Sequence, residues 1–148
     1  MNWNDSCDFC EKLSELTHEQ IQLPTEAQWE YACRAGKEGP YAGTGYLDDM
    51  GWSGGQKPHP VKKKKANAWG LYDMHGNVTE WCSDWMGEYD LEALTDPRGA
   101  VGGWEKVLRG GSYNDNASKC RSASRLGLST RNGGPELGFR PALIPAGE

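Results

Sequence analysis

The chain has 148 residues, a net charge of −5 and a mean hydropathy of −0.78. This length fits one domain, no apolar run reaches the ~18 residues of a membrane-spanning helix, and the acidic balance argues against a general nucleic-acid binder. Aliphatic residues are few, but seven tryptophans and six tyrosines can supply buried area, so we expect a loop-rich fold held by aromatic side chains.

The cysteines do not indicate whether the protein works in an oxidising or a reducing compartment. Their number is odd, so at least one thiol is free or intermolecular: Cys7, Cys10, Cys33, Cys82 and Cys120. The first residues show no basic start followed by an apolar stretch, which is the pattern of a signal peptide. The localisation is therefore unknown, with the cytoplasm and export to the cell surface both open.

The first predicted helix spans about residues 5–16. Asn4 or Asp5 is its expected cap, and three apolar residues recur at helical spacing, Phe9, Leu13 and Leu16. Cys7 and Cys10 have the spacing of a redox motif, but they lie inside this helix and lack a strand–helix–strand context. We therefore favour two half-buried helix cysteines over a redox centre.

The second predicted helix begins directly after Pro24. Residues 25–28, with Thr25 first and Gln28 fourth, form a capping box that starts a helix. The residues expected to face inward are Trp29, Ala32 and Cys33. Gly36 suits a left-handed cap and ends the helix.

After Gly36 the sequence predicts only short strands and turns, which gives an α+β fold with a loop-rich second half. The clearest strand is residues 106–109, and the glycine pair after it permits a close backbone approach. Residues 62–65 are four consecutive lysines. They suit an anion-binding patch or a solvated turn, and in an acidic chain we favour the turn.

Five motifs are distinctive: LPTEAQWEYACRAG (residues 23–36), NAWGLYDMHGNVTEWCSDW (67–85), VLRGGSY (107–113), CRSASR (120–125) and LGFRPA (137–142). In this order and at these separations they resemble the formylglycine-generating enzyme family, also called the sulfatase-modifying factor domain. The resemblance implies a variant of the C-type-lectin fold and one domain over residues 1–148. Family members normally carry a further N-terminal portion with a strand and hairpin, and residue 1 is expected to fall where that portion ends, either in a minimal domain or in a piece of a longer one.

The best-known activity of the family is the oxidation of a sulfatase cysteine to formylglycine, with copper held by two cysteines. Two thiolates are needed because soft sulfur ligands select Cu(I). The family pattern places the first cysteine two residues after GGSY and the second five residues later, at Asp115 and Cys120 here. A carboxylate cannot replace a thiolate, so copper is not expected. No catalytic residue is assigned, and Cys120 is the only candidate.

Cys120 has a second interpretation under the same resemblance. CRSASR is similar to the family segment whose structural cysteine bonds the one in EYAC, which implies a Cys33–Cys120 disulfide. We favour this structural interpretation. Thr79 replaces a tryptophan that borders the family's catalytic pocket, and the retained Ser112 can simply stabilise a turn.

The turn at residues 73–80 is a candidate calcium site. It combines two carboxylates with a glycine, and Ca2+ prefers oxygen ligands. The resemblance implies binding through the side chains of Asp73 and Glu80 and the carbonyls of Gly76 and Val78. The alternative is a tight turn whose carboxylates cap backbone amides. His75, in the same turn, is expected to be a surface residue.

Residues 114–136 lie between the last motifs and are rich in small polar side chains. In lectin-like folds such a surface binds ligands, because loops tolerate substitution. The segment resembles the variable proteins of diversity-generating retroelements, in which randomised adenines diversify the Asn codons of a template. Lys119 and Glu136 do not follow from a single type of Asn codon. An ordinary surface loop is an equal alternative. The candidate ligand-binding residues, within the region 113–137, are Tyr113, Asn114, Asp115, Asn116, Ser118, Lys119, Arg121, Ser122, Ser124, Leu126, Leu128, Thr130 and Asn132.

These features favour a non-catalytic protein that binds a protein or another surface ligand through its C-terminal loop region. A sulfatase-maturing oxidase is the alternative, and a structural domain of a larger assembly is a weaker third hypothesis. Neither nucleic acid nor membrane insertion is expected. A homo-oligomer remains open, because a domain that lacks a strand can complete itself by exchange with a neighbour.

Overall fold

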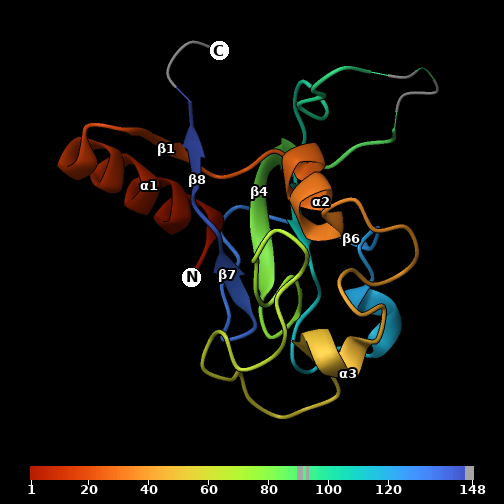
Figure 1. The fold of residues 1–148 in the computed structure, drawn as a ribbon. Coiled ribbons are helices and arrows are strands. Elements are labelled where there is room, and N and C mark those ends of the chain that lie inside the picture. Colours follow the sequence, from red (N-terminus) through yellow and green to blue (C-terminus); the bar gives the residue numbers. More distant parts are fainter. Residues whose placement is uncertain (90–91, 93, 146–148) are drawn as a thin grey trace.

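The computed structural model describes residues 1–89, 92 and 94–145. Its centre is a four-stranded sheet with the order β6-β5-β4-β7 (Figure 1). The strands are β4 (Thr79–Trp85), β5 (Lys106–Arg109), β6 (Arg125–Leu128) and β7 (Leu137–Phe139). Antiparallel pairs join β4 to β5 and β5 to β6, whereas β4 and β7 are parallel. The predicted strand at residues 106–109 is thus confirmed.

Two small sheets flank the central one. β1 (Gln20–Gln22) pairs antiparallel with β8 (Ala142–Ile144). β2 (Gly51–Trp52) pairs in parallel with β3 (His75–Gly76). No helix within the described residues is long and apolar enough to cross a membrane.

The first helix, α1 (Trp3–Thr17), begins earlier than predicted. Its cap is Asn2 rather than Asn4 or Asp5, because the Asn2 side chain accepts from the Asp5 N–H and the Asp5 carboxylate accepts from the Asn2 N–H. The buried face also differs: Ser6 and Cys10 point inward, whereas Phe9 and Leu16 are exposed. The small residues Ser6 and Cys10 are the buried ones, while Trp3 packs on the core at the start of the helix and Phe9 makes an edge contact with Phe139.

The second helix, α2 (Glu26–Arg34), confirms the capping box at Thr25. Trp29 and Cys33 are fully buried, as predicted. The left-handed cap is Ala35, one residue before the predicted Gly36, and its N–H donates to the Tyr31 carbonyl.

Two single-turn helices correct the prediction of strands and turns alone after Gly36. They are α3 (Leu47–Met50) and the 3-10 helix η1 (Ala117–Cys120). One turn is too short to show an apolar periodicity in the sequence, so pattern alone does not reveal such elements.

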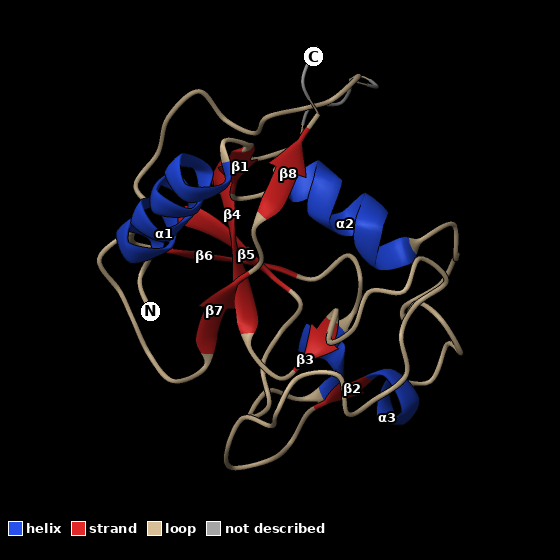
Figure 2. Ribbon diagram, turned by 60° about the vertical axis from the view of Figure 1, so that its left-hand side comes forward, coloured by secondary structure: helices blue, strands red, loops and turns tan. Residues whose placement is uncertain are grey.

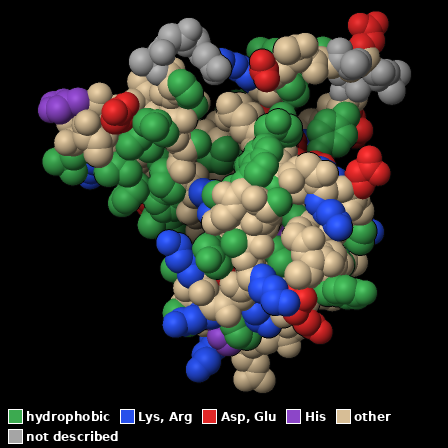
Figure 3. Space-filling view, in the orientation of Figure 1, with side chains coloured by type: hydrophobic (Ala, Val, Ile, Leu, Met, Phe, Trp, Pro, Cys, Tyr) green, Lys and Arg blue, Asp and Glu red, His purple; other side chains and the backbone are tan. Residues whose placement is uncertain are grey.

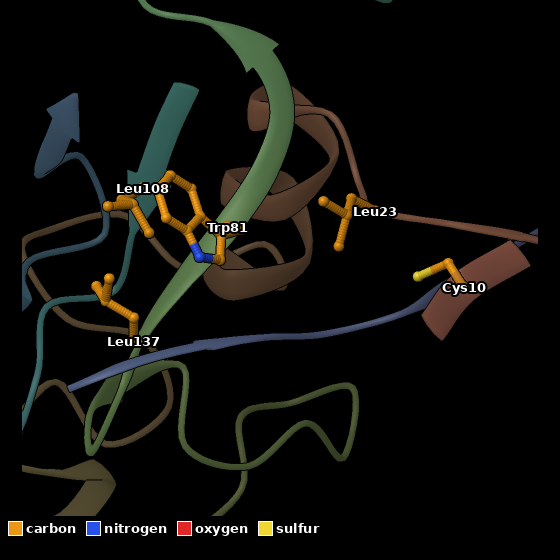
Figure 4. Close-up of a cluster of buried hydrophobic side chains, with 5 residues drawn as sticks. All are labelled: Cys10, Leu23, Trp81, Leu108 and Leu137. Carbon is orange, nitrogen blue, oxygen red and sulfur yellow. The ribbon is translucent and has the colours of Figure 1, made fainter. Parts of the chain in front are cut away.

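The core has one cluster on each face of the central sheet. Consecutive strand residues point to opposite faces, so Trp81 and Leu108 join one cluster while Cys82 and Val107 join the other. The members of the first cluster, shown in Figure 4, are Cys10, Leu23, Trp81, Leu108 and Leu137. Helix α1 covers this face, and α2, with the buried Trp29, covers the other (Figure 2).

Candidate functional site

The C-terminal segment leaves β5 through the glycine pair Gly110 and Gly111. Both have positive φ, +92° and +67°. A Cβ on Gly111 would lie 2.8 Å from the Lys119 carbonyl oxygen and 2.9 Å from the Cys120 sulfur, so only glycine permits this approach. The close approach predicted from the sequence is confirmed, and it brings η1 back against the end of β5.

The candidate ligand-binding residues differ in exposure. The exposed ones are Asn114, Asn116, Ser118, Lys119, Arg121, Leu126 and Asn132, and the partly buried ones are Asp115, Ser124, Leu128 and Thr130. Tyr113 and Ser122 are buried, which contradicts their assignment to an exposed surface. The Tyr113 N–H donates to the Asn77 carbonyl, and Ser122 hydrogen-bonds to the Pro40 carbonyl through both its N–H and its hydroxyl, so both residues anchor the loop.

The exposed candidates fall into two stretches. Residues 113–121 lie against an earlier part of the chain, because Gly54 N–H donates to the Asp115 carbonyl and the Tyr41 hydroxyl donates to the Ala117 carbonyl. Residues 124–132 instead include the edge strand β6 and run towards the N-terminus, where Gly133 approaches Met1. Leu128 packs on the core cluster of Trp81. Residues 113–121 therefore form a more continuous exposed surface than residues 124–132.

The two copper-ligand positions of the family do not form a thiolate pair here. Asp115 Oδ2 accepts from the Ser112 N–H at 2.9 Å and lies 2.7 Å from the Ser112 hydroxyl, so Ser112 stabilises the turn. Burial, with a smaller contribution from Asp115, raises the pKa of the Cys120 thiol to about 11. A carboxylate engaged in a turn cannot supply the second thiolate of a Cu(I) site, so these two positions do not fit copper.

A buried histidine stands beside the two cysteines of the expected disulfide. His75 is fully buried, which corrects its expected place on the surface. Its Nε2 accepts from the Ala42 N–H, so Nδ1 carries the proton and donates to the Cys120 carbonyl at 2.8 Å. The Cys33 sulfur lies 3.7 Å from Nε2. Burial lowers the pKa of His75 and raises that of Cys33 to about 12.

The expected Cys33–Cys120 disulfide is not formed. All five cysteines lie within the described residues and are free thiols. The Cys33 sulfur instead contacts His75, the Met74 carbonyl and the Ser122 hydroxyl. His75 thus contacts both cysteine residues, the sulfur of Cys33 and the carbonyl of Cys120, a feature that the sequence pattern does not reveal.

The four candidate calcium ligands belong to a buried turn at the start of β4. Asp73 Oδ2 accepts from the Lys62 N–H, and Oδ1 has no partner in the described part of the chain. Glu80, however, accepts from Arg140 at 2.8 and 3.0 Å and from the Trp29 indole at 2.7 Å. Calcium would have to displace Arg140, so this carboxylate does not fit as a ligand in the present arrangement.

The carbonyl positions of the same turn are Gly76 and Val78, in and after β3. Within residues 1–89, 92 and 94–145, no group of three or more His, Cys, Asp or Glu side chains converges on a metal position. Calcium binding through the four residues stays a prediction that the geometry does not favour.

A buried charge network, not predicted from the sequence, connects the C-terminal segment to α2. Arg109 is fully buried and donates to Glu30 and to the carbonyls of Ser122 and Ser124. Arg125 forms a bidentate pair with Glu26 at 2.6 and 2.9 Å. These contacts tie the segment after η1 to α2. The signal available in the sequence was Glu26 and Glu30, four residues apart on one helix face.

A cavity of about 660 Å3 adjoins this network. Its walls include Glu26, Asp84, Trp85, Tyr89 and Arg125. Arg125 also lies 4.1 Å from the centre of the Tyr89 ring, which makes the wall both aromatic and charged. The lining also includes Gly87, Glu88 and residues 97–101.

The family comparison matches residues 1–143 to the sulfatase-modifying factor enzyme 1-like domain. The formylglycine-generating enzyme of Streptomyces coelicolor is 37% identical over 166 residues, which cover 96% of this chain and 51% of that protein. The enzyme of Mus musculus is 34% identical and covers 96% of this chain and 42% of that protein. The chain thus spans about half the length of these relatives.

Solved structures confirm the fold expected from the sequence. Treponema denticola variable protein 1 matches with a TM-score of 0.81 and 40% identity, over 86% of this chain and 49% of that one. PvdO from Pseudomonas aeruginosa matches with a TM-score of 0.87 and 28% identity, over 97% and 60% of the two chains. The architecture is the C-type-lectin-like α+β fold, and the resemblance to variable proteins is confirmed.

Proposed function

Because the chain belongs to the sulfatase-modifying factor family, we propose that it uses the family's lectin-like fold as a non-catalytic binding domain. The observation that carries this proposal is Asp115, which lies where the catalytic pattern has a cysteine and is held by Ser112. The partner is expected on the exposed side chains of residues 114–121. A loop of small polar residues on a fixed sheet suits such a role.

The segment's origin in a diversity-generating retroelement is part of the same proposal. Its support is the similarity to Treponema denticola variable protein 1 and the polar composition of residues 114–136. Sequencing the DNA beside the gene tests it directly. A near-copy of the codons for residues 107–140 that differs almost only at adenines, beside a reverse transcriptase gene, is the expected result. Without such a copy, the retroelement origin is wrong.

A partner screen tests the binding function itself. We expect a partner of micromolar or tighter affinity whose binding is lost in the triple variant Asn114→Ala, Asn116→Ala, Ser118→Ala. A matched control changes three exposed residues on α1 and β1, Asn4→Ala, Gln20→Ala and Gln22→Ala, and should leave binding intact. Equal binding by both triple variants would place the partner elsewhere and refute the proposed surface.

The alternative is a sulfatase-maturing oxidase, which the two formylglycine-generating relatives favour. Mass spectrometry of a cysteine-containing sulfatase peptide, incubated with copper-loaded protein, tests it. Conversion to the aldehyde would overturn the non-catalytic proposal. We expect the peptide to remain unchanged, because Asp115 cannot supply a thiolate.

A further inference from the structure

The run of lysines at residues 62–65, for which the sequence favours a solvated turn, belongs to a larger basic surface that the proposed function does not use. Five lysines fall within residues 57–65, which we call the lysine loop: Lys57, Lys62, Lys63, Lys64 and Lys65. The loop follows β2 and forms the lower part of the molecule in the view of Figure 1, and Lys and Arg side chains gather over that part in Figure 3. Such a concentration is unusual in a chain with a net charge of −5.

The lysine loop is fixed to the domain by buried acceptors. The Lys62 N–H donates to Asp73 Oδ2 and the His59 N–H donates to Asn77 Oδ1, each at 2.8 Å. Lys62 adopts a left-handed conformation, with φ of 63°, which a lysine enters at some cost. The loop is thus held in one shape although its side chains are charged and mostly exposed.

Trp52 on β2 organises one side of the lysine loop. The His59 ring stacks on it with a centroid distance of 3.7 Å and an interplanar angle of 14°. The Lys64 Nζ lies 4.2 Å from the Trp52 ring centre and donates to the Asp48 carbonyl at 2.6 Å. A cation on an aromatic face is held in place more firmly than a free lysine.

The lysine loop is continuous with the proposed binding surface. The N–H groups of Gly54 and Gly55 donate to the carbonyls of Asp115 and Tyr113, at 2.8 and 2.6 Å. Lys57 follows two residues later, within about 7 Å of chain. The N-terminal end of the lysine loop is therefore joined by backbone hydrogen bonds to residues 113–115, at the start of the proposed binding surface.

We propose that the partner bound at residues 114–121 presents an acidic polypeptide segment to the lysine loop. This rests on the proposed binding function and names the chemistry of its partner. Lys65 is paired with Asp49, but Lys57, Lys62 and Lys63 form no salt bridge with the described residues. The ammonium groups of Lys57 and Lys63 can therefore meet carboxylates, whereas that of Lys62 lies 5.9 Å from the centre of the Tyr72 ring. Complementary charge speeds and orients association.

The surroundings of the lysine loop favour a peptide over other polyanions. Asp48 and Asp49 lie directly beside it on α3, and they would repel a flat anionic membrane or a regular phosphate backbone. Trp52 has His59 stacked against it and Lys64 above it, so it offers no free platform for a nucleic-acid base. A peptide can place its carboxylates opposite the lysines and avoid the aspartates.

The test uses a fluorescent oligoglutamate peptide as the probe, with anisotropy as the readout. The test variant is Lys57→Glu with Lys63→Glu, and the control, Lys12→Glu with Lys37→Glu, carries the same net charge on exposed lysines elsewhere. We expect the wild type and the control to bind equally and the test variant about tenfold more weakly, from the loss of two surface attractions and the gain of repulsion. Added salt should weaken wild-type binding.

Other outcomes overturn the inference. Equal binding by the two double variants, or no binding to the wild type, shows that the lysine loop does not receive an acidic peptide. Preference for single-stranded DNA of equal charge, or for vesicles containing phosphatidylserine, assigns the loop to another polyanion. The partner screen with the Asn114, Asn116 and Ser118 variant has a separate readout, so a failed acidic-partner inference leaves the binding function standing.

Discussion

Residues 106–112 and 113–121 follow one another in the chain, yet they differ in almost every physical respect. The first stretch is buried throughout, and its Arg109 is held by carboxylates and carbonyls. The second stretch buries Tyr113 and Cys120 near its ends and exposes small polar side chains between them. Its backbone is held by hydrogen bonds to other parts of the chain, among them Gly54, Asn77 and His75. The charged network therefore fixes the position of the surface, and we expect the side chains on that surface to contribute little to stability.

Removal of Arg109 should have the largest effect. Arg109→Met leaves the Ser122 and Ser124 carbonyls without their donor. It also removes the buried cation that faces Glu26 and Glu30, which keep Arg125 and Arg34 as their cationic partners. We therefore expect a loss of about 3–5 kcal/mol in the free energy of unfolding. Urea denaturation measures it. The control is Arg131→Met, because Arg131 is exposed and should change stability little. A small effect of Arg109→Met would show that the buried pairs are not required.

Gly111→Ala should come next. Its positive φ costs about 1–3 kcal/mol for alanine, and the new Cβ would also clash with the Lys119 carbonyl. Gly102→Ala is the matched control, because a Cβ there has no neighbour within 4 Å. Thermal unfolding of both variants measures the difference. Equal melting temperatures would contradict the close approach of η1 to the end of β5.

A smaller effect is expected from the pH dependence of His75. Its pKa is lowered below 6.5 by burial, so the unfolded chain binds the proton more readily than the folded one. The stability that neutral His75 contributes is complete above pH 6.5 and is lost as the pH falls below that value through the folded pKa. His75→Gln should flatten the stability curve below pH 6.5 relative to the wild type, as urea titrations at several pH values would reveal. Parallel curves for the two proteins would refute this.

The exposed loop should show the smallest effect on stability. Asn114→Ala and Asn116→Ala are expected to change the free energy of unfolding by no more than about 0.5 kcal/mol each. Thermal unfolding checks this, and the same variants should lose partner binding. A loss of several degrees in Tm would instead give these side chains a structural role and weaken the contrast between the two stretches.

Local signals predicted part of this architecture well. The capping box at Thr25, the strand at 106–109 and the glycine pair were read correctly because each depends on neighbouring residues. The prediction of the buried face of α1 from apolar spacing was wrong, because tertiary packing buries Ser6 and Cys10 instead.

Long-range features lay beyond the sequence pattern. His75 was assigned to the surface because a polar residue in a turn is usually exposed, but Ala42 and Cys120 supply its hydrogen bonds from distant parts of the chain. Arg109 meets Glu30 across almost eighty residues, and no periodicity reports such a pair. Family resemblance identified the fold, but not the partners of these buried groups.

The close approach of Gly111 to the Lys119 carbonyl closes residues 111–119 into a loop, and closing a loop costs conformational entropy. The cost of closing a flexible loop grows only with the logarithm of its length, so doubling it costs about 0.6 kcal/mol. Insertions between residues 113 and 119 would therefore burden the domain little, provided that the closing contact survives. The surface can vary in shape and reach as well as in side-chain chemistry, while the strands on either side keep their register.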